Sequence, residues 1–287
     1  MTYDTRQPQA AFLTSDTALF RSACMPPRPA WYVWVYFAVI AMAAFGGTFL
    51  ATVVSGRHFD PSLAWLLKCM LVMTSVVILT TVYLRRDGLL WSRYGVSLTP
   101  QALKHCALGL AFGLVLTLAW IVIVACWAPF QWRANPTLRW EAVITGTLAS
   151  FAMGVAEEVG YRSYGMERLR QDHGFIAALT IPTVIFVLAH KVGGVPWLPA
   201  VLVIGSSGLL YASLMSMTRS LPLVAGFHIA NNLAQDALLR TSDGSLWMPV
   251  FRDITLAELH GPGIWTCMAL LNLSIAAWAI KHRAQTA

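Results

Sequence analysis

Apolar runs on the order of 20 residues recur along this chain, and that is the length an α-helix needs to cross the hydrocarbon core of a bilayer. They lie at about 31–54, 63–84, 103–128, 141–166, 174–190, 197–218, 221–240 and 262–280. Each run is bounded by charged residues, proline or glycine. Of the 287 residues, 57% are hydrophobic and only 11% are charged, which is more apolar surface than a soluble core can bury. We therefore expect an all-α polytopic membrane protein, a bundle of about eight transmembrane helices.

The two ends of this pattern suggest a simple domain organisation. Residues 1–30 are polar and mixed in charge, and no apolar stretch near the start resembles a cleavable signal peptide, so we expect an N-terminal tail. Residues 31–284 then form one transmembrane domain. The polar residues of functional interest fall within 155–236.

Basic residues lie mainly in the short loops between the apolar runs. The net charge of +7 is not arranged as a basic stripe interleaved with aromatics, so we expect no nucleic-acid partner. If the N-terminus is inside, thirteen of the 20 Lys and Arg residues fall on the cytoplasmic side and seven on the other. The positive-inside rule therefore favours both termini in the cytoplasm. The five cysteines show no CxxC spacing and suggest neither a disulfide framework nor a zinc knuckle.

Two adjacent glutamates, Glu157 and Glu158, stand inside the fourth apolar run. A charged side chain at the bilayer centre costs roughly 2.5–3.5 kcal/mol on insertion scales, so such residues indicate function by default. Glu158 and Arg162 are four residues apart on one helical face and are expected to pair. Glu157 is then left available to take a proton from water. The alternative is a purely structural ion network.

Further polar residues occur in the fifth and seventh runs. His190 ends the fifth run, while His228 and Asn232 lie four apart on one face of the seventh. Each histidine alone could equally be a hydrogen-bonded interior residue. Together with Glu157, these groups could hydrolyse a peptide bond, which needs a confined water, a base and donors to the oxyanion. Asn231 points elsewhere, and we expect it to contact another helix.

The depth of His190 fits this grouping poorly. A fifth helix that starts near Gly174 would place His190 about 24 Å along it, close to the far leaflet, whereas Glu157 would lie near mid-membrane. The two meet only if the fifth helix is tilted or starts earlier.

The three motifs Glu157-Glu158-x-x-x-Arg162, Phe186-x-x-x-His190 and His228-x-x-x-Asn232 occur in this order on successive runs. They resemble those of the CPBP family, the CAAX-protease and bacteriocin-processing membrane proteases, which includes the eukaryotic Ras-converting CAAX endoprotease. The resemblance covers about residues 140–235 by motif.

This resemblance implies a glutamate-type endopeptidase whose cavity lies among helices four to seven. Glu157 and His190 would activate water, and His228 and Asn232 would form the oxyanion hole. The supporting residues are expected to be Glu158, Arg162, Tyr161 and Phe186, with Tyr161 placed to hydrogen-bond Glu157. The family implies no obligatory metal; if zinc were bound, its ligands would be Glu157, His190 and His228.

The expected partners are membrane lipid and a protein or peptide substrate that could itself carry a lipid, such as a CAAX-like tail, a leader or a C-terminal sorting segment. The expected location is the bacterial inner membrane, and the oligomeric state stays open. Two other functions remain as alternatives. A non-catalytic scaffold or bacteriocin self-immunity factor could keep the same fold. A proton-coupled transporter could use buried Glu and His as a relay, although no internal repeat is evident in the sequence.

Overall fold

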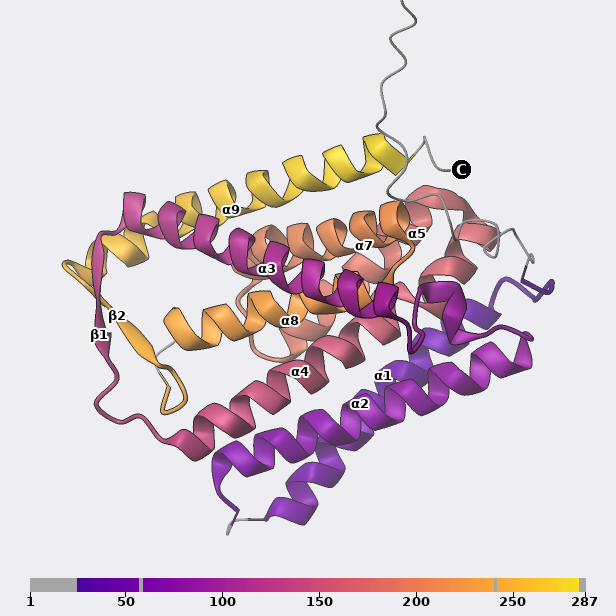
Figure 1. The fold of residues 1–287 in the computed structure, drawn as a ribbon, viewed down its shortest axis with the longest axis horizontal. Coiled ribbons are helices and arrows are strands. Elements are labelled where there is room, and N and C mark those ends of the chain that lie inside the picture. The colour runs from indigo at the N-terminus through magenta and orange to yellow at the C-terminus, as the bar shows by residue number, and fades with distance from the viewer. Residues whose placement is uncertain (1–24, 57–58, 240–241, 284–287) are drawn as a thin grey trace, which may run out of the picture.

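The computed structural model describes residues 25–56, 59–239 and 242–283. In these residues the chain forms a bundle of long helices with one short two-stranded ribbon at an end (Figure 1). Most of the expected N-terminal tail, residues 1–24, lies outside the described part of the chain.

The helices follow the apolar runs closely. Their bounds are α1 Tyr32–Ser55, α2 Pro61–Arg86, the 3-10 turn η1 Trp91–Tyr94, α3 Pro100–Trp127, α4 Trp140–Arg162, α5 Tyr164–Val192, α6 Trp197–Pro199, the π-helical η2 Ala200–Gly205, α7 Ser206–Thr218, α8 Leu221–Leu238 and α9 Ile254–Arg283. Within the described residues, six spans are long and apolar enough to cross a membrane, one of which combines α4 and α5. The 18-residue helix α8 is not among these spans. The all-α, multi-pass architecture is confirmed.

Three of the helices start with the same local chemistry, a polar cap followed by a proline. Asp60 caps α2, Thr99 caps α3 and Ser220 caps α8, each accepting a hydrogen bond from a backbone N–H in the first turn. A cap oxygen satisfies a backbone donor that the helix cannot, and proline at the start loses no helical hydrogen bond. These caps and prolines explain why the three helices begin at Pro61, Pro100 and Leu221.

The boundary between α4 and α5 differs from the prediction. The fourth helix was expected to reach residue 166 and the fifth to begin at 174, whereas α4 ends at Arg162 and α5 begins at Tyr164 with a break at Gly174 (φ 86°). The extra turns are polar and have no apolar run to reveal them. They are held by tertiary contacts, since the buried Arg168 donates from Nη1 to the carbonyl of Pro26 at 2.7 Å.

The ribbon was also not expected. Strand β1 (Phe130–Ala134) pairs antiparallel with β2 (Trp247–Phe251), with Phe130 opposite Phe251. The indole Nε1 of Trp132 donates to the carbonyl of Leu238 at 2.9 Å, which ties the ribbon to the end of α8. These two segments are short and lie between apolar runs, so the helix pattern gives no sign of them.

Helix α3 crosses α8 at very close range. A Cβ at Gly109 would overlap the carbonyl oxygen of Leu223, and one at Gly113 would overlap the carbonyl oxygen of Phe227. On the facing helix, a Cβ at Gly226 would lie 2.5 Å from the carbonyl oxygen of Cys106. Small residues at a helix interface let two backbones approach, as is common in membranes. The glycines thus fix the position of α8.

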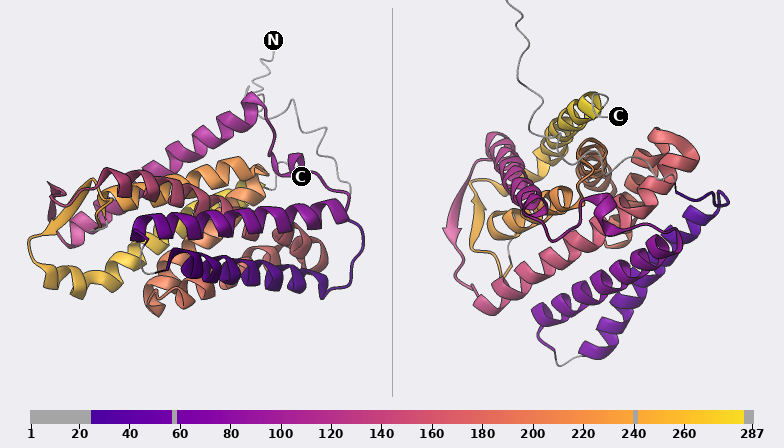
Figure 2. Two further views of the ribbon diagram at one scale, coloured as in Figure 1. Left: turned by 90° about the horizontal axis from the view of Figure 1, so that it is seen from below. Right: turned by 45° about the vertical axis from the view of Figure 1, so that its right-hand side comes forward.

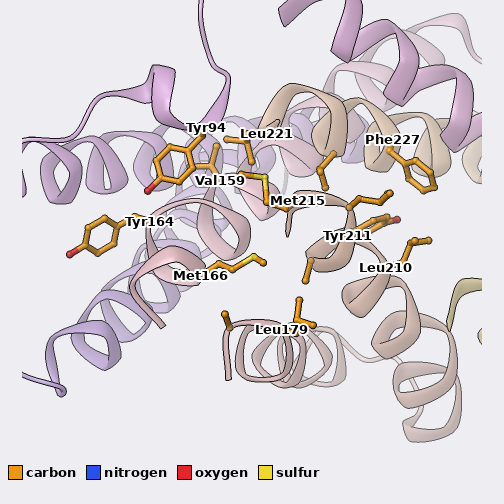
Figure 3. Close-up of a cluster of buried hydrophobic side chains, with 14 of the residues drawn as sticks. Tyr94, Val159, Tyr164, Met166, Leu179, Leu210, Tyr211, Met215, Leu221 and Phe227 are labelled. Atoms are coloured by element: carbon orange, nitrogen blue, oxygen red, sulfur yellow. The ribbon is translucent and has the colours of Figure 1, made fainter. Parts of the chain in front are cut away.

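The remaining long helices pack around this pair. Helix α2 lies between α1 and α4, and α9 packs on α7 (Figures 1 and 2). Buried side chains from α4, α5, α7 and α8 form one apolar cluster in the middle of the bundle, in which Val159, Leu210, Tyr211 and Phe227 take part (Figure 3). Val159 and Phe227 are the sequence neighbours of Glu158 and His228. The core therefore holds the helices that carry the predicted site.

One end of the bundle is rich in arginine. The ends of α2 and α7 meet the start of α5 there, because Tyr164 Oη donates to Asp87 Oδ2 at 2.7 Å and Arg219 Nη1 lies 3.4 Å from Glu167 Oε2. Asp87 also pairs with Arg28 at 2.8 Å.

The opposite end carries the ribbon and an ion pair between the caps of α2 and α4, in which Arg139 Nη2 lies 2.8 Å from Asp60 Oδ2. Hydrogen bonds from Ser62 and then from Arg139 hold the pKa of Asp60 below its usual value.

Candidate active site

The two adjacent glutamates of α4 meet His228 of α8. Glu158 Oε1 accepts a hydrogen bond from His228 Nδ1 at 2.7 Å, and Glu157 Oε2 lies 3.4 Å from His228 Nε2. The Glu158 side chain is fully buried and that of His228 is 5% exposed, whereas Glu157 remains 19% exposed. One histidine ring is thus held between two carboxylates, of which only Glu157 is accessible.

Arg162 supports this arrangement from the next turn of α4. Its Nη1 lies 3.4 Å from Glu158 Oε1, which confirms the pair predicted from the i,i+4 spacing. Its Nη2 donates to the carbonyl of Gly208 on α7 at 3.3 Å. The guanidinium carbon lies 4.7 Å from the ring centre of Phe186 and 5.6 Å from that of Tyr211. Such stacking helps to hold a buried guanidinium in place.

Tyr211 was missed by sequence reasoning. Its ring stacks on the His228 imidazole with 4.6 Å between the ring centres. The available signal was a tyrosine in the middle of an apolar run, but nothing in the spacing linked α7 to α8. Together with the hydrogen bond to Glu158, the stacking fixes the plane of the His228 ring.

His190 reaches the cluster through Phe186. The Nδ1–H of His190 donates to the Phe186 carbonyl at 2.9 Å, and the two rings are 4.4 Å apart. The same phenyl ring lies edge-on to His228 at 6.2 Å. His190 therefore lies one ring away from His228, despite the depth estimated from sequence. Helix α5 starts at Tyr164, but the non-helical residue Gly174 separates these first turns from the part of the helix that carries His190.

Two other predicted site residues, Asn232 and Tyr161, make no hydrogen bond to the glutamates or to His228 in the described part of the chain. Asn232 lies one turn beyond His228 on α8 and is partly buried, and its side chain makes no hydrogen bond to another described residue. The expected hydrogen bond from Tyr161 to Glu157 does not form; the Tyr161 ring packs against Phe186 at 5.4 Å instead. Asn231 Nδ2 donates to Thr117 Oγ1 on α3 at 2.9 Å, which confirms it as a helix contact.

A metal site is not preformed. In the described part of the chain, no group of three or more His, Cys, Asp or Glu side chains is arranged to hold a metal ion. The residues expected as zinc ligands if a metal is bound, Glu157, His190 and His228, therefore do not form such a group. His228 already directs one nitrogen at each glutamate.

Residues 139–234 match the model described as Type II CAAX prenyl endopeptidase Rce1-like. This segment is a CAAX-protease-family domain. No curated protein and no solved structure matches the chain.

The CAAX-protease-family domain covers the whole of the geometry described above. It starts one residue before α4 and ends inside α8, so it contains all three motifs and the helices that bring them together. The matched family is one of membrane peptidases. The chain is an integral, multi-pass membrane protein. Helices α1 to α3 and α9 lie outside the matched range.

Proposed function

We propose that the chain is a glutamate-type intramembrane endopeptidase, with Glu157 and His190 activating water and His228 and Asn232 binding the oxyanion. The observation that carries this proposal is the approach of Glu157 to His228. Because Nδ1 of the imidazole is held by the buried Glu158, Nε2 faces the accessible carboxylate at 3.4 Å. A base and a potential oxyanion donor from different helices thus address one small space.

Water activation falls to Glu157 and His190. Glu157 has no Lys or Arg partner among the described residues, so its carboxylate is available to accept a proton. The Nδ1–H of His190 donates to the Phe186 carbonyl, which leaves Nε2 as the ring nitrogen available to a water. The proton moves from the attacking water to a base and later to the leaving amine.

Oxyanion binding falls to His228 and Asn232. His228 can bind the oxyanion when its Nε2 carries a proton, which it then donates to the oxygen of the scissile carbonyl. The Asn232 amide is not engaged by another described residue and lies one turn away on the same face of α8. Both donors therefore come from a helix that the α3 glycines hold in place.

The substrate we propose is a membrane-associated protein or peptide. A lipid-modified CAAX-like tail, a leader and a C-terminal sorting segment all fit this class. A site inside a helical bundle favours segments delivered from the lipid phase. We further infer a bacterial inner-membrane location with both termini in the cytoplasm, which the arginine-rich end of the bundle supports.

Replacing Glu157 tests this function. Substrates are first identified as membrane peptides that are cleaved in cells making the wild-type protein. In cells making Glu157→Gln these peptides should stay intact, and the purified variant should cleave them about 10²- to 10⁴-fold more slowly than wild type. Glu141→Gln is the matched control, because Glu141 lies exposed at the start of the same helix. Unchanged cleavage by folded Glu157→Gln protein would rule the mechanism out.

We also propose that hydrolysis needs no metal, since the polar groups above suffice for the proton transfers. Treatment of purified protein with a chelator should leave the cleavage rate unchanged. Loss of the rate, with recovery on adding one equivalent of zinc, would instead assign Glu157, His190 and His228 as ligands after rearrangement.

A further inference from the structure

A pocket beside Arg162 opens at the arginine-rich end of the bundle, and neither Glu157 nor His228 lines it. It lies where the end of α4, the first turns of α5 and the last turn of α7 meet. Its empty space is about 250 Å³, counting the open mouth, and its narrow inner part has room for little more than one water-sized group. Arg162 and Ser216 line the pocket together with Glu167, Arg170 and Arg219.

Two buried residues that line this pocket each have a polar atom without a hydrogen-bond partner in the described part of the chain. Arg162 is 1% exposed and Ser216 is 5% exposed. Neither Nε of Arg162 nor Oγ of Ser216 has a hydrogen-bond partner among the described residues. An unsatisfied buried donor destabilises the folded state, more so when the group is charged, so a native pocket normally supplies an acceptor.

The charge of the pocket favours an anion as that acceptor. Its one carboxylate, Glu167, is already engaged by Arg93 at 2.6 Å and by Arg219 at 3.4 Å. Arg170 adds a further positive charge at the mouth. Burial lowers the pKa of Arg219, and repulsion from Arg170 and Arg93 acts in the same direction against the attraction of Glu167. Positive charge thus exceeds negative charge around this pocket.

We propose that this pocket binds a phosphate oxyanion, supplied by the headgroup of an anionic phospholipid. Arginine donates to phosphate through paired N–H groups, and basic pockets between helices at the membrane rim suit lipid headgroups. One phosphate oxygen would enter the narrow part and accept from Arg162 and Ser216, while Arg170 and Arg219 face the others. This site is separate from the space between Glu157 and His228, and its occupancy does not depend on proteolysis.

Binding is measured on the purified full-length chain in zwitterionic detergent. Short-chain phosphatidylglycerol is titrated while the midpoint of thermal unfolding is followed, since a ligand that binds the folded state raises this midpoint saturably. The pocket variant is Arg170→Gln with Arg219→Gln, which leaves the Arg93–Glu167 pair in place. The matched control is Arg85→Gln with Arg86→Gln, which removes two exposed charges from the same end of the bundle.

Wild-type protein and the control should show the same saturable rise, and the pocket variant should bind about tenfold or more weakly, as expected for the loss of at least one charged hydrogen bond. Short-chain phosphatidylcholine should give no such rise. If inorganic phosphate competes at similar concentration, the oxyanion assignment stands and its source is free phosphate. The proposal is wrong if neither short-chain phosphatidylglycerol nor inorganic phosphate raises the unfolding midpoint of the wild-type protein saturably. It is also wrong if the folded pocket variant responds to phosphatidylglycerol as the wild type does.

Discussion

Glu158 joins two partners that are far apart in the sequence, Arg162 four residues away and His228 seventy residues away. The first contact follows from helical spacing and was predicted from it. The second depends on how α4 packs against α8, and no local pattern encodes this packing. A residue predicted only to neutralise an arginine therefore also orients the histidine that we propose as an oxyanion donor.

Glu158→Gln separates these two roles. The neutral amide oxygen can still accept from His228 Nδ1, but a hydrogen bond to an uncharged acceptor is weaker and holds the ring less firmly, so we expect kcat about 10- to 100-fold lower with KM little changed. Stability should also fall, because Arg162 loses its buried counter-ion. Steady-state kinetics and thermal unfolding check this, with Glu141→Gln as the control. An unchanged kcat in folded variant would remove Glu158 from the mechanism.

The sequence predicted the charged residues of the candidate site better than it predicted their contacts. The cost of burying charge in lipid singled out Glu157 and Glu158, and i,i+4 spacing paired Glu158 with Arg162. Stacking of Tyr211 on His228 and of Phe186 against His190 could not be predicted, because both depend on tertiary packing. The roles of His190 and Asn232 remain predictions that cleavage assays must test.

At the scale of elements, the apolar runs located the helices, but they did not say which helices touch. Close packing of α3 on α8 depends on the glycines at 109, 113 and 226, which carry no hydrophobic signal. The polar first turns of α5 were missed for a related reason, because they are stabilised by a tertiary hydrogen bond that Arg168 donates to the carbonyl of Pro26. The length of a membrane-spanning helix can therefore be predicted from composition, whereas the pairing of helices depends on the shapes of their packed surfaces.

Gly113→Ala should disturb the site from a distance. The new methyl group would meet the carbonyl oxygen of Phe227 and lie 2.9 Å from the Ala230 Cβ, so α8 must shift around His228. We expect a loss of about 1–3 kcal/mol in stability, together with reduced cleavage. Gly146→Ala is the matched control, because nothing lies within 4 Å of its Cβ. Thermal unfolding and cleavage of both variants decide, and wild-type behaviour of Gly113→Ala would show that α8 tolerates the shift.

At the scale of the molecule, the bundle has two chemically different ends. Arginines 28, 93 and 219 meet acidic partners at one end, where α2 finishes and α5 begins. The ribbon and the Asp60–Arg139 pair lie at the other. This sorting agrees with the charge count made from the sequence. It supports placing the arginine-rich end, with its proposed phosphate site, at the cytoplasmic face.

That orientation gives a direct labelling prediction. In a background without the native cysteines, Gln131→Cys on the ribbon and Arg86→Cys at the end of α2 place exposed thiols at opposite ends of the bundle. A membrane-impermeant maleimide should label Gln131→Cys in intact cells and Arg86→Cys only after permeabilisation. The reverse pattern would put the arginine-rich end outside. Cytoplasmic termini and lipid binding from the inner leaflet would then both be wrong, while the contact between Glu157 and His228 would be unaffected.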